Sequence, residues 1–339
     1  MIGRVIALDY FNGREAAALI EDGKLVDFLV DGDAPRPGAI YMAVADRPAK
    51  GQGGMFLSTP DGSAFLRQAK DARQGSPILA QVNGYPDTGK AIPVTARVLF
   101  KSRYVIITPG ATGMNISRRI KDDDVRNELH SIMRKYMEDD ELGLILRSSC
   151  LKAGEEEISK DIIAMRNLAV QTLDEARGAK PGKIARGAGP HELAWRDWDA
   201  SAHVEKPPGS FERHGVHDML DFMENPHVSL NANANMYVEQ TRAMVTVDVN
   251  TGDDRTGAAG LKANLAMAKE LPRQLRIRGM GGQVSIDLAP MSKKHRGLFE
   301  TALRKAFMND VTGTALCGWT PLGHFELRRK RDRAPLSQY

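Results

Sequence analysis

The sequence predicts a mixed α/β protein that carries a small closed β-barrel in its N-terminal third. Three observations support this prediction. Apolar and polar residues alternate over residues 1–32, short β-prone runs separated by turn residues fill residues 35–98, and strands alternate with helices from Ser102 onward. The chain has 339 residues, 42% of them hydrophobic, which is enough apolar material for two or three cores.

Residues 1–32 are expected to form a small sheet, because VIALDY and EAAALIEDGKLVDFLV have the period of half-buried strands. The Asp-Gly pair at 22–23 is a hairpin turn signal. Residues 35–98 contain five short runs, AIYMAV, GGMFLS, SAFLR, PILAQV and IPVTARV, separated by Gly, Pro, Asp and Asn. Their number and spacing fit a five-stranded barrel of the oligonucleotide-binding type.

Two helices are predicted in the next part of the chain, near residues 122–137 and 155–177. The first has acidic residues in its first turn and Arg134 and Lys135 in its last turn, which complements the helix dipole. Strands RYVIITPG and LGLILRSS flank it. Residues 178–236 are rich in Gly, Pro, His and Asn, and they show a helical pattern only near 215–224.

Charge and cysteine content limit the class of protein. Lys and Arg total 47 against 43 acidic residues, so the net charge of +4 permits a phosphate-rich partner without requiring one. Cys150 and Cys317 lie far apart, which excludes a disulfide framework and a cysteine zinc site. The chain shows neither a signal sequence nor a run of the roughly 20 apolar residues that cross a bilayer. We therefore expect a soluble cytoplasmic protein with no membrane partner.

The run AMVTVDVN at 243–250 predicts a strand with Asp248 and Asn250 on its polar face. A helical pattern follows, and then a second strand, QVSIDL. A right-handed β-α-β crossover would bring Asp248 and Asp287 to the carboxyl ends of neighbouring parallel strands. Two carboxylates there suit Mg²⁺, which keeps several waters and also contacts phosphate. The alternative is that each aspartate only caps a turn.

The stretch YVEQTRAMVTVDVNTG, followed by NLAMAKELPRQLRIRGMGGQVSIDLAPM, resembles the catalytic region of the ribonuclease E/G family. The resemblance implies that Asp248 and Asp287 hold Mg²⁺, with Mn²⁺ as an alternative ion, and that Asn250 orients Asp287 or the scissile phosphate. It implies an endoribonuclease that cuts single-stranded RNA in RNA processing or decay and leaves a 5′-phosphate. The alternative is a relative that binds RNA but cuts it weakly or not at all.

Two upstream stretches, RYVIITPGATGMNISRRI and GLILRSS, are also similar to motifs of this family. The resemblance implies that Arg147 and Ser148 recognise a 5′-terminal monophosphate, as a guanidinium beside a hydroxyl can. It also implies that Arg118 and Arg119 contact backbone phosphates, the alternative being ordinary surface charge. For Arg147 the alternative is an ion pair with an acid of EDDE at 138–141.

The barrel takes the position of the family's S1 domain. That position implies that Phe56 and Phe65 stack on bases and that Lys90 contacts phosphate. Core packing is the alternative for each phenylalanine. The fold class implied is an S1-like barrel inserted into a trimmed RNase H-like and DNase I-like catalytic scaffold. The implied domains are N-terminal RNase H-like strands (1–34), the S1-like barrel (35–98), the 5′-sensor subdomain (99–177), a trimmed RNase H-like segment (178–236), and the DNase I-like catalytic subdomain with a basic tail (237–339).

Some features depart from the family pattern. The segment before the catalytic strand is shorter than usual, and Pro272 is expected to kink the helix between the two aspartates. No CPxC zinc-link motif is found, so we expect no structural zinc and a monomer or weak dimer without a zinc-linked assembly.

Two further groups of residues have competing interpretations. The basic run ELRRKRDR at 326–333 offers phosphate contacts or forms a solvated terminus. His214 and His217, in HGVHD, lack a third placed ligand, so surface positions are expected rather than a zinc site.

Overall fold

The computed structural model describes residues 3–51, 53–69, 72–137, 141–198, 201–231, 233–308 and 310–338. The chain forms two compact units. One comprises residues 1–32 and 199–339, and the other comprises residues 33–198. Each unit contains a hydrophobic core of its own. Among the described residues, no helix combines the length and apolar character that crossing a bilayer would require.

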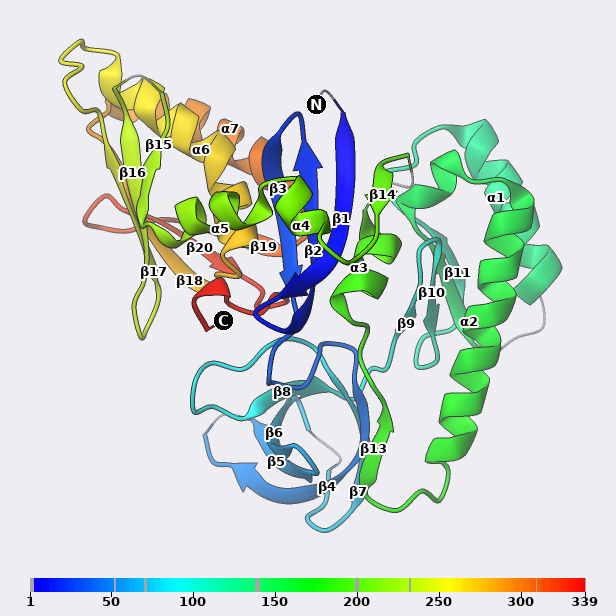
Figure 1. Ribbon diagram of the computed structural model, residues 1–339. Helices are drawn as coiled ribbons and strands as arrows, with labels where there is room; N and C mark the ends of the chain where they lie inside the picture. Colours follow the sequence, from blue (N-terminus) through cyan, green and yellow to red (C-terminus); the bar gives the residue numbers. More distant parts are fainter. Residues whose placement is uncertain are drawn as a thin grey trace. The chain divides into compact units, whose positions relative to one another are not determined.

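A closed five-stranded barrel forms the first part of the unit 33–198. Its strands are β4 (Ile40–Ala49), β5 (Gly54–Thr59), β6 (Gly62–Arg67), β7 (Pro77–Val82) and β8 (Ile92–Thr95). The order β4-β5-β6-β8-β7 closes because β7 also pairs with β4, and the ring is visible in Figure 1. A short strand, β13 (Gly182–Ala185), adds to β4. The predicted barrel is therefore confirmed and is compatible with an oligonucleotide-binding fold.

The second part of this unit is a four-stranded sheet with helices. The strands, in spatial order, are β11 (Met114–Ile116), β12 (Gly143–Leu146), β10 (Val105–Thr108) and β9 (Phe100–Lys101). The helices are α1 (Asp123–Met137), α2 (Glu155–Ala176) and α3 (Pro190–Asp197), and a short 3₁₀-helix spans Ser148–Lys152. Helices α1 and α2 match the two predicted helices, because each has an apolar stripe that packs on the sheet.

The other unit begins with a sheet in the order β14 (His203–Glu205), β1 (Arg4–Phe11), β2 (Arg14–Glu21) and β3 (Lys24–Val30). The predicted turn joins β2 and β3, and Asp22 and Gly23 both have positive φ, 49° and 78°, as a tight hairpin requires. Strand β14 pairs in parallel with β1. The RNase H-like character of this sheet stays a prediction.

Residues 178–236 contain more structure than expected. Helix α5 (Val216–Glu224) matches the predicted helix, but α3 and the short α4 (Ser210–Arg213) were not predicted. The sequence around them is typical of loops, because each helix follows a glycine and α3 opens with Pro190. Strand β13 and α3 lie in the unit 33–198, whereas β14, α4 and α5 lie in the other unit.

A six-stranded sheet forms the rest of the second unit. Its strands, in spatial order, are β15 (His227–Ser229), β16 (Asn235–Gln240), β17 (Val245–Asn250), β18 (Gly282–Asp287), β20 (Phe325–Arg329) and β19 (Thr314–Trp319). The helices are α6 (Ala259–Ile277) and α7 (Arg296–Met308), with 3₁₀-helices at Lys293–His295 and Leu336–Gln338. The core cluster joins α6 and α7 to one face of this sheet.

The predicted β-α-β unit is confirmed, since β17 and β18 are parallel neighbours and α6 connects them. Pro272 is buried inside α6 and does not end that helix.

Candidate active site

Asp248 and Asp287 are register partners on the parallel strands β17 and β18. Val247 and Val249 are buried in the core, so Asp248 points to the opposite, exposed face of the sheet. Asp287 is exposed on the same face, with 67% of its side chain accessible. Because neighbouring strands lie about 4.8 Å apart, the two carboxylates stand side by side near the carboxyl ends of their strands.

Asn250 holds one of these two carboxylates. Its Nδ2 donates a hydrogen bond to Oδ2 of Asp248 at 3.0 Å. The sequence-based expectation named Asp287 or the substrate phosphate as its partner. The carboxylate that Asn250 contacts is that of Asp248, because residues two apart on a strand share a face.

Asn264 supports the chain just beyond Asp287. It is fully buried in α6, its Nδ2 donates to the carbonyl of Ala289 at 2.9 Å, and its Oδ1 accepts from the Ala289 N–H at 3.0 Å. A Cβ at Gly260 would lie 1.9 Å from the Pro290 carbonyl oxygen, so only glycine permits this close approach. The first half of α6 is thus fastened to the segment that follows β18.

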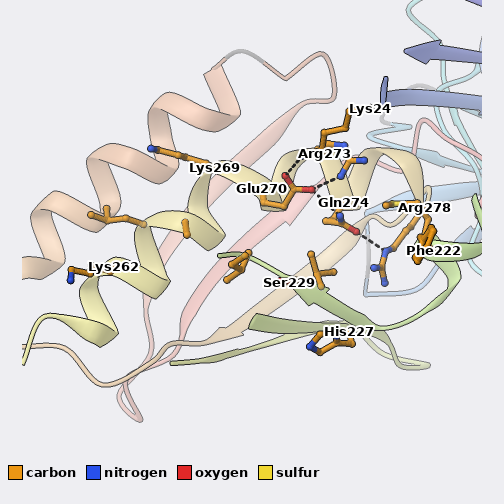
Figure 2. A pocket seen from close by; sticks show the side chains of 15 residues that line it. Lys24, Phe222, His227, Ser229, Lys262, Lys269, Glu270, Arg273, Gln274 and Arg278 are labelled. Atoms are coloured by element: carbon orange, nitrogen blue, oxygen red, sulfur yellow. Dashed lines mark hydrogen bonds and ion pairs between the residues drawn. The ribbon is translucent and has the colours of Figure 1, made fainter. Parts of the chain in front are cut away.

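Three arginines of the RQLRIR stretch fasten the second half of α6. Arg273 donates to the Leu25 carbonyl at 2.5 Å, Arg276 to the Val26 carbonyl at 2.7 Å, and Arg278 to the Val238 carbonyl at 3.1 Å. Figure 2 shows the side chain of Glu270 between Lys24 and Arg273, with which it forms ion pairs. These arginines stabilise the scaffold of the site.

A groove of about 710 Å³ runs beside α6. Lys262 and Lys269 line it from the helix and are exposed, and Phe222 of α5 lies at its rim with 76% exposure. Figure 2 places the two lysines along one side of α6. This basic groove lies on the helix-covered side of the sheet, whereas Asp248 and Asp287 lie on the opposite face.

The basic run 326–333 is partly structural, which corrects its interpretation as a tail. Arg329 belongs to β20, is 3% exposed, and forms a buried ion pair with Asp310. Arg333 pairs with Asp27 at 3.0 Å. Because β20 lies between β18 and β19, its inward-facing arginine is unavailable to RNA.

The carboxylate pair fits a hard divalent cation. Both aspartates offer exposed oxygen atoms on one face, and Nε2 of His324 lies 3.7 Å from Oδ1 of Asp287. Within the described ranges, no group of three or more His, Cys, Asp or Glu side chains could enclose a metal ion. An ion that keeps several waters and takes few protein ligands, as Mg²⁺ does, suits such a pair.

His214 and His217 have separate structural contacts. The side chain of His214 is 6% exposed and its Nε2 lies 3.1 Å from Glu205. The ring of His217 stacks near Phe11, with centroids 6.1 Å apart. The side chain of His214 is therefore buried, contrary to the expected surface position, whereas His217 is exposed as expected.

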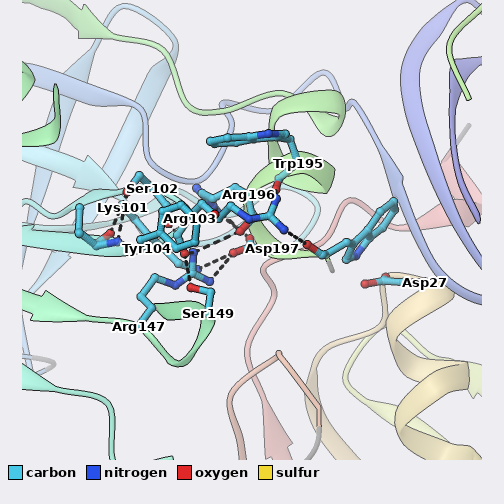
Figure 3. Close-up of polar contacts among 12 residues, drawn as sticks. Asp27, Lys101, Ser102, Arg103, Tyr104, Arg147, Ser149, Trp195, Arg196 and Asp197 are labelled. Carbon is cyan, nitrogen blue, oxygen red and sulfur yellow. Dashed lines mark hydrogen bonds and ion pairs between the residues drawn. The ribbon is translucent and has the colours of Figure 1, made fainter. Parts of the chain in front are cut away.

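Arg147 forms an ion pair with Asp197. Its Nη2 donates to Oδ1 of Asp197 at 2.6 Å, and its Nη1 donates to the carbonyls of Ser102 and Arg103 (Figure 3). Ser148 begins the adjoining 3₁₀-helix and is half-buried. Residues 138–140 of the acidic run proposed as partners lie outside the described residues. The observed partner is Asp197, at the end of α3.

The cations around Asp197 determine its charge. Burial opposes its ionisation, but the hydrogen bond and charge of Arg196, with the charges of Lys101 and Arg147, hold the pKa of Asp197 well below its ordinary value. Burial, together with the charges of Arg196 and Arg147, lowers the pKa of Lys101 to about 8, although the charge of Asp197 acts to raise it. The cluster is strongly cationic around one internal carboxylate.

Arg118 and Arg119 follow β11, which is parallel to β12 and pairs Ile116 with Leu146. Both arginines are exposed. They therefore leave their strand at the same sheet edge as Arg147, and the Ser117 N–H donates to the Leu146 carbonyl there at 2.8 Å.

Phe56 and Phe65 lie on the outer surface of the barrel. They are cross-strand partners on β5 and β6, their ring centroids are 5.3 Å apart, and both are half-buried. Their chain neighbours fill the barrel core, so these rings point outward. The Arg47 guanidinium lies 5.1 Å from the Phe56 ring centre. Lys90 is exposed and pairs with Asp87 at 2.7 Å.

No role was predicted for Tyr237, Asn264, His324 or Asp197. Alternation in NMYVEQ could have placed Tyr237 on the exposed face, because Met236 and Val238 are apolar. For Asn264 the signal was a polar residue on the buried face of a helix. No local pattern indicates that His324 lies near Asp287 or that Asp197 pairs with Arg147.

An oligonucleotide-binding-type barrel and an exposed carboxylate pair in one chain are typical of proteins that process nucleic acids. The chain belongs to the ribonuclease E/G family, whose sequence model matches residues 100–206 and 196–332.

Individual relatives cover most of the chain. Ribonuclease G of Escherichia coli strain K12 is 27% identical over 303 residues, which span 77% of this chain and 61% of the relative. Ribonuclease G of Haemophilus influenzae is 25% identical over 385 residues, spanning 94% and 78%. Ribonuclease E of a Nostoc species is 24% identical over 375 residues, spanning 94% and 54%. The chain thus spans less than two thirds of the E. coli relative.

Proposed function

We propose that this chain is a magnesium-dependent endoribonuclease that cuts single-stranded RNA in RNA processing or decay. The observation that carries the proposal is the register pairing of Asp248 with Asp287 on one exposed sheet face. Family membership supports RNA as the substrate. The relatives are named ribonucleases G and E.

Asp248 and Asp287 would hold the metal ion in this proposal. Bound Mg²⁺ supplies polarisation of the phosphodiester and an activated water. Asn250 keeps the Asp248 carboxylate oriented through its hydrogen bond, and Asn264 keeps the segment after Asp287 in place. Cleavage would leave a 5′-phosphate on one product, and the departing 3′-oxygen would take its proton from solvent.

Contacts to the rest of the RNA would come from surfaces in the unit 33–198. The outward rings of Phe56 and Phe65 can stack on bases of any sequence. Lys90, Arg118 and Arg119 are exposed and can contact backbone phosphates.

A preference for 5′-monophosphorylated ends is part of the proposal and rests on Arg147 and Ser148. Arg147 already binds the Asp197 carboxylate, so a terminal phosphate must compete with an internal anion. A terminal phosphate carries more charge than a carboxylate at neutral pH and has three acceptor oxygens. The same cationic cluster can therefore exchange one anion for the other.

The test is cleavage of a 5′-monophosphorylated, A/U-rich single-stranded RNA with Mg²⁺ and with EDTA. The proposal expects Asp248→Asn and Asp287→Asn to abolish cutting. Asp221→Asn is the matched control, because this exposed acid lies on α5, outside the carboxylate pair. Cutting that neither active-site substitution reduces would refute the proposal.

The second candidate function is RNA binding without cleavage. It is favoured by the small number of protein ligands, since only two carboxylates converge among the described residues. Tight RNA binding by the wild-type protein, with no magnesium-dependent product, would establish this alternative.

A further inference from the structure

Four residues form a straight row across the sheet that carries the carboxylate pair. Strand register aligns His227 with Tyr237, Tyr237 with Asp248, and Asp248 with Asp287. The row crosses β15, β16, β17 and β18 in turn. Directly paired residues on neighbouring strands project from the same face of a sheet, so all four side chains share one face.

The face that carries this row is the one turned away from the helices. Met236 and Val238, which flank Tyr237, are buried in the core formed with α6 and α7. Tyr237 itself is 40% exposed, although its ring is large and aromatic. His227 is exposed and packs edge-on against the Tyr237 ring, with centroids 5.3 Å apart. The histidine braces one side of the tyrosine and leaves part of the ring accessible.

Spacing across the row matches the dimensions of a nucleotide. Strands are separated by about 4.8 Å, so Tyr237 lies one strand from Asp248. In a nucleotide the base is separated from its phosphate by the sugar. A phosphate placed at the carboxylate pair would therefore bring a neighbouring base over the tyrosine ring. Aromatic rings bind unpaired bases by stacking, without regard to base identity.

We infer that Tyr237, braced by His227, is a base-stacking site for the nucleotide next to the scissile phosphate of single-stranded RNA. This inference rests on the proposed function, because it takes Asp248 and Asp287 as the place of cleavage. Stacking there fixes the nucleotide beside the reacting phosphodiester, and it requires that this base be unpaired. Tyr237 thereby selects single-stranded over duplex substrate at the point of cutting.

The experiment compares wild-type protein with Tyr237→Ala and Tyr237→Phe on a short A/U-rich RNA that has one cleavage site. A parallel set of RNAs lacks a single base at each position around that site. Phe222→Ala is the matched control, because it removes an exposed aromatic ring that lies on α5, outside the row on the sheet. Circular dichroism verifies that each variant is folded.

Wild type is expected to lose kcat/KM on the order of ten-fold when the base next to the cleaved bond is missing. On the intact RNA, Tyr237→Ala should have a kcat/KM that is lower than that of wild type by the same factor. Removing the base should not lower the kcat/KM of Tyr237→Ala any further. Tyr237→Phe and Phe222→Ala should behave as wild type, since the stacking ring is retained.

The inference would be overturned if Tyr237→Ala cleaved the intact RNA as fast as wild type does. It would also be overturned if the tyrosine substitution and the missing base each lowered kcat/KM independently, so that their effects multiplied. Either result would leave the proposed function intact. If wild type shows no magnesium-dependent cutting of the intact RNA, the proposed function fails and the inference fails with it.

Discussion

The side chain of Asn264 binds both polar backbone groups of Ala289, two residues beyond Asp287. The asparagine is 0% exposed, so its side chain is shielded from bulk water. Helix α6 thereby fixes the end of the strand that carries one of the two carboxylates.

Replacing Asn264 by Ala should therefore impair both stability and metal-dependent cleavage. Two buried hydrogen bonds are lost, which lowers the free energy of unfolding by about 2 kcal/mol. The Mg²⁺ concentration needed for half-maximal cleavage should rise, because Asp287 is no longer held in place. Urea denaturation and a magnesium titration measure the two effects. An unchanged magnesium midpoint would show that Asn264 has only a stabilising role.

Replacing Asp197 by Asn should increase discrimination in favour of a 5′-monophosphate. The substitution removes the internal anion that pairs with Arg147 at 2.6 Å, so a terminal phosphate meets less competition. Cleavage of 5′-monophosphate and 5′-hydroxyl RNAs by wild type, Asp197→Asn and Arg147→Ala gives the comparison. If Arg147→Ala and wild type treat the two ends alike, Arg147 is not a sensor.

The same substitution should lower the pKa of Lys101 further below about 8, because the charge of Asp197 acts to raise it. The pH dependence of acetylation at Lys101, followed by mass spectrometry, reports this pKa. An unchanged or raised midpoint in Asp197→Asn would contradict the assigned interaction.

Lys101 should also make stability increase with pH in the alkaline range. Its pKa is about 8 in the folded protein and near the ordinary 10.5 when unfolded. Between these values the unfolded chain binds more protons, so the free energy of unfolding rises with pH. The side chain is 39% exposed, so solvent screening makes this rise small. In Lys101→Met, the free energy of unfolding should rise less between pH 8 and 10.5 than in wild type. The same pH dependence of stability in both proteins would refute this role of Lys101.

The ion pair of Asp310 with Arg329 should be essential for folding of its unit. The two side chains are 0% and 1% exposed, and Arg276 also pairs with Asp310 at 2.6 Å. Asp310→Ala leaves the buried Arg329 guanidinium without its carboxylate, whereas Arg276 keeps its pair with Asp27, and the loss should cost about 3–5 kcal/mol. Glu156→Gln, which breaks a fully exposed pair with Lys160, should leave the denaturation midpoint unchanged, because solvent screens that pair. Equal denaturation midpoints for the two variants would contradict this account.

Local patterns predicted the elements that depend on local physics. Alternation of valines with polar residues placed Asp248 on an exposed face, and the handedness of β-α-β units placed Asp287 beside it. Turn residues at close intervals likewise predicted the barrel.

Long-range partners were not predictable in this way. Asp197 lies 50 residues from Arg147 in the chain. It belongs to helix α3, which was not predicted because the glycine and proline at its start indicate a loop. Arg329 occupies a basic run that suggests a solvated tail, but its position in an interior strand and the carboxylate of Asp310 bury it. Such pairings follow from tertiary packing, which a sequence pattern of a few residues does not specify.

The most direct test of the central claim is the single-turnover cleavage rate as a function of Mg²⁺ concentration for wild type, Asp248→Asn and Asp287→Asn. Loss of an outer partner of a metal site typically costs 10- to 100-fold, so loss of either carboxylate should cost more than about 100-fold at any magnesium concentration. Wild-type rates and an unchanged magnesium midpoint in either variant would contradict the two-carboxylate site.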